Sequence, residues 1–113
     1  MPAVLRRDTP RVTIAPKRER YLTCTGDLMM VVIDFEDGPM DEADPPHSHP
    51  HDQTSYVAEG EVLFTVGEET HRVQAGDMVA IPSDVPHTLQ LLTKTARLVD
   101  AFHPVRDDFL AQE

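Results

Sequence analysis

The sequence predicts an all-β fold, a sandwich or barrel of short strands. Short segments rich in β-branched or apolar residues follow one another, and Gly, Pro and Asp separate them. Two separators, EGE at 59–61 and VGEET at 66–70, are typical of hairpin turns. No helical periodicity of useful length appears before VRDDFLAQE at 105–113, where we expect one short C-terminal helix.

The strand-like segments can be placed one by one along the chain. We expect strands at 20–24, 28–36, 47–59, 61–67, 70–74, 77–82, 86–93 and 96–103. Val62, Phe64 and Val66 alternate with other residues, as in a strand with two unequal faces. The stretch LMMVVI at 28–33 is apolar on both faces, which favours burial by the barrel on one side and by a second subunit on the other. We therefore expect a homodimer.

The N-terminal residues differ from the rest of the chain. Pro2, Pro10 and Pro16 argue against a helix, so we expect an extended arm over 1–19 and a single domain over 20–113. Residues 1–20 hold six basic and two acidic residues, whereas the remainder holds four basic and eighteen acidic ones. The part of the chain after residue 20 is acidic enough to repel nucleic acid and anionic membranes. We therefore expect neither as a partner. The basic arm is expected to lie against an acidic body, its own or that of a partner subunit.

The cysteine content and the lack of long apolar runs indicate the cellular compartment in which the protein is expected. One cysteine, Cys24, excludes an intramolecular disulfide and fits a reducing compartment. No apolar run approaches the ~18 residues that cross a bilayer, and the N-terminus shows no secretory signal. We expect a cytoplasmic protein.

The strongest chemical signal is the run PPHSHPHDQ at 45–53. His47, His49, His51 and Gln53 occupy every second position, so in an extended chain their side chains would share one face. Neutral imidazoles are the commonest transition-metal ligands, and mixed nitrogen and oxygen sets suit Zn, Ni, Mn, Fe, Co or Cu. A merely solvated His-rich loop is the alternative.

A further histidine lies downstream in GDMVAIPSDVPHTLQL at 76–91. His87 has the same strand parity as Leu89 and Leu91. If the two leucines line the interior, His87 points inward as well.

These two segments resemble the two motifs of single-domain cupins. The first matches as His47-x-His49-(x)3-Gln53-(x)6-Gly60, and the second as Gly76-(x)5-Pro82-x-Asp84-(x)2-His87-(x)3-Leu91. The resemblance spans roughly residues 20–103 and implies a cupin double-stranded β-helix, which is a small jelly-roll barrel. Carried over by position, the implied metal ligands are His47, His49, Gln53 and His87, and the implied cofactor is one divalent transition metal ion (Ni, Zn, Mn, Fe or Co). His51 falls between the ligand positions and is expected next to the ligands or at the mouth of the site, with a role as a fifth ligand as the alternative that parity leaves open.

The sequence departs from the cupin pattern at three positions. Gln53 stands where the family usually has Glu, Asp84 replaces a Gly, and Leu91 replaces an Asn. Three neutral histidines and a neutral amide would leave the full charge on a divalent ion, which favours binding of an anionic substrate and Lewis-acid chemistry. Loss of chemistry altogether is the alternative meaning of the Gln.

The segment RLVDAFHPVRDDFL at 97–110 contains further candidate site residues, which narrow the range of possible functions. Leu98, Asp100 and Phe102 share one strand parity, so an interior Leu98 and Phe102 would place the Asp100 carboxylate in the interior too. A cation in a metal pocket would offset the free-energy cost of burying the Asp100 carboxylate. In the opposite register, Asp100 would instead face the solvent. Arg106 either reaches over the mouth to bind a substrate carboxylate or pairs at the surface with Asp107 or Asp108.

This tail also resembles that of the pectin-degradation (KdgF-type) cupins. The resemblance implies ring opening or isomerisation of 4,5-unsaturated uronate monosaccharides from pectin or alginate breakdown. It implies that Asp100 relays a proton, Arg106 orients the substrate and Phe102 shapes and dries the pocket. The partner would then be a small anionic or polar organic substrate.

Three other functions remain open on sequence alone. One is a mononuclear metal dioxygenase acting on a small aromatic or diketone, against which Gln53 argues mildly. Another is a non-catalytic cupin that binds a small molecule. The last is a structural or storage barrel with an inherited metal, in which the replacement of Asp100 by Ala would change no activity.

Overall fold

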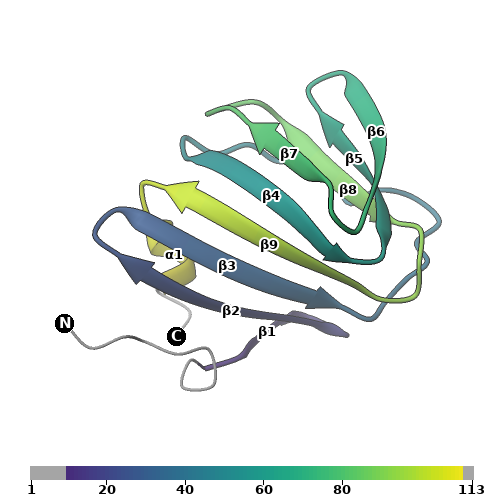
Figure 1. The fold of residues 1–113 in the computed structure, drawn as a ribbon, viewed down its shortest axis with the longest axis horizontal. Coiled ribbons are helices and arrows are strands. Elements are labelled where there is room, and N and C mark those ends of the chain that lie inside the picture. Colours follow the sequence, from purple (N-terminus) through teal and green to yellow (C-terminus); the bar gives the residue numbers. More distant parts are fainter. Residues whose placement is uncertain (1–9, 111–113) are drawn as a thin grey trace.

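The structure is a computed structural model that describes residues 10–110 (Figure 1). Its elements are β1 (Val12–Ala15), β2 (Arg18–Thr25), β3 (Leu28–Phe35), β4 (Asp52–Glu59), β5 (Glu61–Val66), β6 (Glu69–Gln74), β7 (Met78–Ile81), β8 (His87–Leu91), β9 (Ala96–His103) and α1 (Asp107–Leu110). They form a six-stranded sheet in the order β1-β2-β3-β9-β4-β7 and a three-stranded sheet in the order β6-β5-β8. All of the strand pairs are antiparallel. The two sheets enclose the interior, which confirms the all-β expectation.

The interior is apolar towards one end of the strands. Alternate residues of β4, β5 and β9 point inward and are buried, because successive side chains of a strand point to opposite faces. The main cluster comprises Phe35, Val57, Val62, Phe64, Val73, Ile81, Leu91, Ala96 and Leu98. Burial of this many aliphatic side chains provides the largest favourable contribution to folding.

A second, smaller cluster lies where α1 meets the large sheet. Leu22, Met29, Val31 and Phe102 are buried, and Val105, Phe109 and Leu110 pack against them. The short helix therefore docks through its apolar residues, and the expected C-terminal helix is present at Asp107–Leu110. Residues 111–113 of that prediction lie outside the described part of the chain.

The acidic loop after β3 runs beside β8 and carries the chain towards the first histidines. Backbone hydrogen bonds join Met40 N to Leu91 O at 2.9 Å and Asp44 N to Leu89 O at 3.2 Å. The main chain comes so close at Gly38 that a Cβ there would lie 1.8 Å from the carbonyl oxygen of Thr93. Only glycine permits this contact, and the loop is thereby held along β8.

The largest differences from the expected strands lie at the first histidines and at the N-terminus. The expected strand 47–59 begins at Asp52 instead, with only an isolated bridge between His47 and His87 before it. Pro50 supplies no backbone N–H for a sheet ladder, so a regular strand cannot run through it. At the N-terminus, β1 was not expected and β2 begins at Arg18, so residues of the predicted arm belong to the sheet. Three β-branched residues, Val12 to Ile14, favour that strand.

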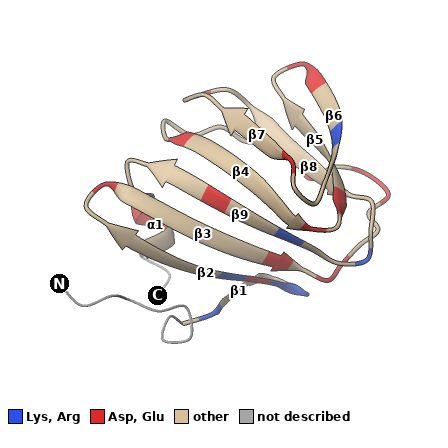
Figure 2. Cartoon of the chain, viewed as in Figure 1, with Lys and Arg blue, Asp and Glu red and all other residues tan. Residues whose placement is uncertain are grey.

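Basic and acidic residues meet between β2 and the loop after β3. Arg18 Nε donates to Asp37 at 2.9 Å, and Arg18 Nη1 donates to Asp44 at 2.7 Å. Basic residues lie along β1 and β2, whereas many acidic residues lie at strand ends and in connecting loops (Figure 2). In the described part, basic residues of the predicted arm thus pair with acidic residues of the same chain.

The two faces of β3 differ in exposure. Met29 and Val31 are fully buried, whereas Leu28 and Met30 remain about half exposed on the outer face. Within residues 10–110, no helix has the length and apolarity needed to span a membrane.

Candidate metal centre

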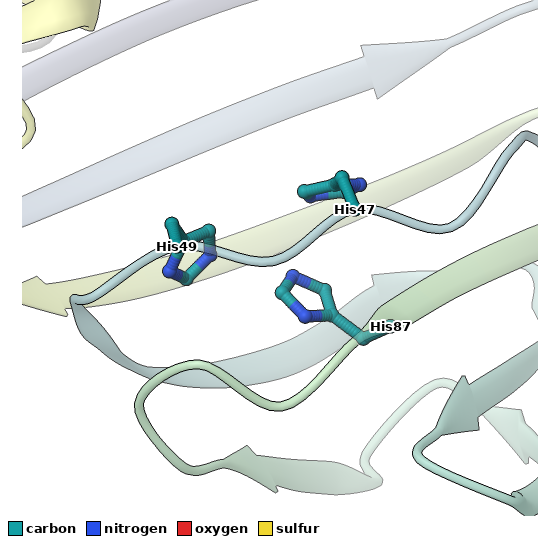
Figure 3. Close-up of side chains that lie close together, drawn as sticks. All are labelled: His47, His49 and His87. Carbon is teal, nitrogen blue, oxygen red and sulfur yellow. The ribbon is translucent and has the colours of Figure 1, made fainter.

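Three histidines from two segments converge at the open end of the interior. His47 and His49 lie on the segment before β4, and His87 is the first residue of β8 (Figure 3). One ring nitrogen of each lies within 4.8 Å of the others. The paired backbone hydrogen bonds between His47 and His87, at 2.9 and 3.1 Å, bring the two segments together. The structure therefore assembles the three histidines that the sequence motifs single out.

Backbone carbonyls orient two of the three rings. His49 Nδ1 lies 3.0 Å from the carbonyl oxygen of His51, and His87 Nδ1 lies 2.9 Å from that of Val85. A neutral ring that donates through Nδ1 keeps a lone pair on Nε2, which is how metal-binding histidines are usually held. His87 Nε2 is buried and has no hydrogen-bond partner among the described residues.

Gln53 extends the donor set, and its contacts fit a metal ion. Its side chain is buried on β4, and Oε1 lies 2.9 Å from His49 Nε2. With Nδ1 of His49 donating to a carbonyl, both of these atoms carry lone pairs in the neutral state. Two lone-pair atoms at this separation fit adjacent positions around one ion whose bonds are about 2.1 Å long. His47, His49, Gln53 and His87 are thus suited to hold a divalent transition metal.

The electrostatics of the histidines also suit a metal. Burial lowers the pKa of His47, and the neighbouring charges of His87, His49 and Arg106 lower it further. Burial also lowers the pKa of His87, although its hydrogen bond to the Val85 carbonyl opposes the shift. Both rings are therefore neutral at pH 7, and a neutral ring is the form that binds a metal.

Asp100 lies in the interior beside the histidines. It is buried on β9, directly opposite Ser55 of β4, whose hydroxyl donates to Asp100 Oδ1 at 2.6 Å. Burial raises the pKa of Asp100 to about 6, although the Ser55 hydrogen bond, the charge of Arg106 and a hydrogen-bonding interaction with the Gln53 side chain oppose the shift. The inward parity predicted for Leu98, Asp100 and Phe102 is confirmed, since all three are buried.

Phe102 and Arg106 adjoin the same space. The Phe102 ring meets the His49 ring edge-on with 5.7 Å between centroids. Arg106 stacks over Phe102 at 5.2 Å and over Phe109 at 3.9 Å, and it also binds Asp108 with its Nη2 at 2.7 Å from the carboxylate. Arg106 therefore pairs with Asp108, as one of the two alternatives predicts, and it also lines the cavity.

A cavity of about 270 Å³ connects these groups. Its polar lining includes Arg18, Arg20, Asp44, His47, Gln53, His87, Thr88, Asp100 and Arg106, and its apolar lining includes Phe35, Phe64, Leu98, Phe102 and Phe109. Ligand sites typically combine an apolar wall with a few convergent polar groups. A small polar molecule fits this description.

Two motif positions have structural roles. His51 lies outside the three-histidine cluster and contributes its carbonyl to His49. Asp84 has a φ of +65°, a region that favours glycine and tolerates Asp, which accounts for its place in the second motif. Its backbone N–H donates to the carbonyl of His49 at 2.8 Å and so helps to hold the ligand loop.

Sequence reasoning missed two residues of the site. Ser55 is fully buried between Gln53 and Asp100, and Arg20 lines the cavity with its guanidinium 3.9 Å from the Phe109 ring centroid. Strand parity could have indicated both, because Ser55 is two residues from Gln53 and Arg20 is two residues from Leu22, so each pair shares one face of its strand. Their partners come from distant parts of the chain, which parity alone cannot identify.

Comparisons with known proteins identify the family and agree with the overall fold. The family model described as "Cupin domain" matches residues 34–102. The chain is 33% identical over 94 residues to the pectin degradation protein KdgF of Dickeya dadantii strain 3937, covering 82% of this chain and 83% of that protein. A solved RmlC-like cupin from Shewanella frigidimarina NCIMB 400 has a TM-score of 0.82 at 32% identity and covers 94% of this chain and 93% of its own. The structure of KdgF from Halomonas sp. has a TM-score of 0.81 at 29% identity, with 93% and 94% covered.

The chain belongs to the cupin family, and it is similar to KdgF proteins over most of its length. The cupin fold predicted from the two motifs is therefore confirmed.

Proposed function

We propose that this cupin is a metal-dependent enzyme that opens the ring of 4,5-unsaturated uronate monosaccharides released from pectin or alginate. The observation that carries the proposal is the placement of Asp100, a buried carboxyl with a pKa of about 6, in the cavity that His47 and His87 also line. Such a group exchanges protons near neutral pH, as an acid and base catalyst must. The likeness to a protein named for pectin degradation supports the choice of substrate.

The reaction needs proton transfer and no oxidant. The proton of the anomeric hydroxyl leaves, the bond between C1 and the ring oxygen breaks, and C4 gains a proton as a ketone forms at C5. The linear keto sugar is therefore an isomer of the ring form. In our proposal Asp100 takes the hydroxyl proton as a carboxylate and returns a proton to the sugar as a carboxylic acid.

The other cavity residues bind and orient the sugar in this proposal. Arg106 faces the cavity while Asp108 and the Phe109 ring hold its guanidinium, so it can bind the sugar carboxylate without large side-chain reordering. The Phe102 ring covers one side of His49 and keeps water from the reacting atoms. A divalent transition metal held by His47, His49, Gln53 and His87 would supply Lewis acidity towards the oxygen atoms of the substrate.

An anaerobic proton NMR time course tests the activity. Metal-reconstituted protein is mixed with freshly prepared 4,5-unsaturated galacturonate, and loss of the vinyl proton signal is compared with the uncatalysed background. We expect clear acceleration without oxygen, which a dioxygenase could not produce. A rate equal to the background in protein shown to contain metal would contradict the uronate assignment.

We also infer a homodimer formed through the outer face of the large sheet. Leu28 and Met30 of β3, Tyr56 of β4 and Met78 of β7 are exposed large apolar residues. Tyr56 lies opposite both Met78 and Val99 in the sheet register, so part of this surface is continuous across β7, β4 and β9. An exposed apolar patch of this kind marks an interaction surface, and a second copy supplies a complementary apolar face.

Sedimentation velocity tests the inferred dimer. The wild-type protein should sediment as a dimer that the substitution Met30→Glu dissociates, and a monomeric wild-type protein would refute the inferred dimer.

The proposed substrate is a monosaccharide, and we place the reaction in the cytoplasm. The single Cys24 gives the chain no intramolecular disulfide and fits a reducing compartment. Fractionation of cells that express the tagged protein tests this placement.

A further inference from the structure

A continuous series of close polar contacts, the last two of which are hydrogen bonds, joins the histidine cluster to Asp100. His49 Nε2 lies 2.9 Å from Gln53 Oε1, Gln53 Nε2 donates to Ser55 Oγ at 2.9 Å, and Ser55 Oγ donates to Asp100 Oδ1 at 2.6 Å. Gln53, Ser55 and Asp100 are all buried, and Ser55 is only 1% exposed. Gln53 and Asp100 also line the cavity, whereas the enclosed hydroxyl of Ser55 depends on these two partners for its hydrogen bonds.

Which group donates and which accepts in this series of contacts is determined by the number of protons that each group carries. An ionised carboxylate only accepts hydrogen bonds, so the single hydroxyl proton of Ser55 goes to Asp100. The oxygen of Ser55 then accepts a hydrogen bond, and the nearest donor is the amide nitrogen of Gln53. With its nitrogen held by Ser55, the amide of Gln53 presents its oxygen to His49.

We propose that Ser55 is a positioning residue that holds the amide of Gln53 with its oxygen, and not its nitrogen, facing the metal site. The two ends of a glutamine amide have nearly the same shape, so packing alone does not choose between them. An amide nitrogen donates hydrogen bonds and does not bind a cation, whereas the oxygen is a suitable metal ligand. This inference rests on the proposed metal dependence and adds to it the residue that makes Gln53 a competent ligand.

The same series of contacts explains why an amide stands at position 53. A glutamate would leave the Ser55 hydroxyl with two acceptors and one proton. It would also place a second carboxylate close to Asp100, and two like charges in a buried site oppose each other. Gln53 satisfies Ser55 with a donor and the metal site with an acceptor, so Asp100 can remain beside the cluster.

Zinc affinity of the metal-free protein tests the proposal at pH 8 by competition with a chromophoric chelator. Ser55→Ala removes the acceptor, and we expect Zn²⁺ to bind about tenfold more weakly, in the range typical for loss of a group that orients a metal ligand. Ser55→Thr retains the hydroxyl and should stay within about threefold of the wild type. Both variants are compared with the wild type in thermal unfolding, so that a folding defect is recognised.

The Gln53→Glu background separates positioning from a general structural role. A carboxylate has two equivalent oxygens and no wrong orientation, so Ser55→Ala should change Zn²⁺ affinity there by less than about threefold. An equal tenfold loss in both backgrounds would overturn the proposal, as would unchanged affinity in Ser55→Ala alone.

A second measurement does not depend on metal or substrate. In a ¹⁵N–¹H spectrum of the metal-free protein, the side-chain amide of Gln53 is assigned by its loss in Gln53→Glu. We expect two separate, slowly exchanging amide protons in the wild type and in Ser55→Thr, and fast exchange in Ser55→Ala. Unchanged exchange in Ser55→Ala would overturn the proposal. If the wild type binds no Zn²⁺, the proposed function fails, whereas this spectrum still tests whether Ser55 orients the amide.

Discussion

The two halves of the barrel interior differ sharply although the same strands build both. In one half β4 contributes Val57 and β9 contributes Leu98, and these side chains are fully buried in the apolar cluster. In the other half β4 contributes Ser55 and β9 contributes Asp100, which face each other in a hydrogen-bond chain next to the histidines. The polar and the apolar inward-facing side chains are thus only two residues apart along each of these strands. The apolar half fixes the strand registers, and those registers place the polar groups of the other half.

This comparison predicts that substitutions in the polar half change binding and turnover, whereas those in the apolar half change stability. The largest effect is expected from His87→Ala. It removes a ligand whose Nε2 is buried and otherwise has no hydrogen-bond partner in the described chain. Zn²⁺ should bind more than about 100-fold more weakly, because loss of a supporting residue alone typically costs 10–100-fold. His71→Ala, in an exposed side chain of β6, is the control, and full metal retention in His87→Ala would refute the ligand assignment.

The next largest effect is expected from Asp100→Asn, which keeps the shape and the acceptor for Ser55 but removes the exchangeable proton. Uronate turnover should fall at least about 100-fold, since acid–base catalysis contributes roughly 10²–10⁴-fold. Zn²⁺ affinity should change little. Asp107→Asn, at an exposed position of α1, serves as the matched control. Wild-type turnover in Asp100→Asn would remove that residue from the proposed mechanism.

Leu98→Ala probes the apolar half in the same strand, two residues away. The side chain is 1% exposed, so its truncation leaves a cavity in the main cluster. The free energy of unfolding should fall by about 2–5 kcal/mol, measured by urea denaturation. Zn²⁺ affinity of the folded variant should stay near that of the wild type. A large loss of affinity without a loss of stability would show that the two halves are not separable.

The smallest effect is a pH dependence of stability in the metal-free protein. Burial raises the pKa of Asp100 from 3.8 to about 6, so between these values the folded state holds more of the proton than the unfolded state does. The contribution of Asp100 to stability is thus fully present below about pH 4 and is lost as the pH rises through about 6. Two pKa units correspond to about 3 kcal/mol. The difference in unfolding free energy between wild type and Asp100→Asn should follow this curve, and a difference that is constant from pH 4 to pH 7 would contradict the shift.

Patterns of two-residue spacing allowed the sequence by itself to predict much of the molecule. Alternation along 96–103 predicts that Leu98, Asp100 and Phe102 face inward, and the short spacings of the His motifs mark the three clustered histidines. Such patterns are readable because the side chains of a strand alternate between its two faces. His51 has the same parity, but Pro50 interrupts the strand before it and its ring lies outside the cluster, so the motif spacing and not the parity separates it from the ligands.

Only the tertiary structure decided which inward-facing groups meet. Ser55 and Asp100 are 45 residues apart in the chain and become partners through the register of β4 against β9. The approach of the loop at Gly38 to Thr93, and the stacking of Arg20 on Phe109, likewise join segments from different elements. Register between distant strands is set by the packing of the whole apolar core. The local sequence therefore specified which side chains enter the interior, whereas folding of the complete chain specified their neighbours.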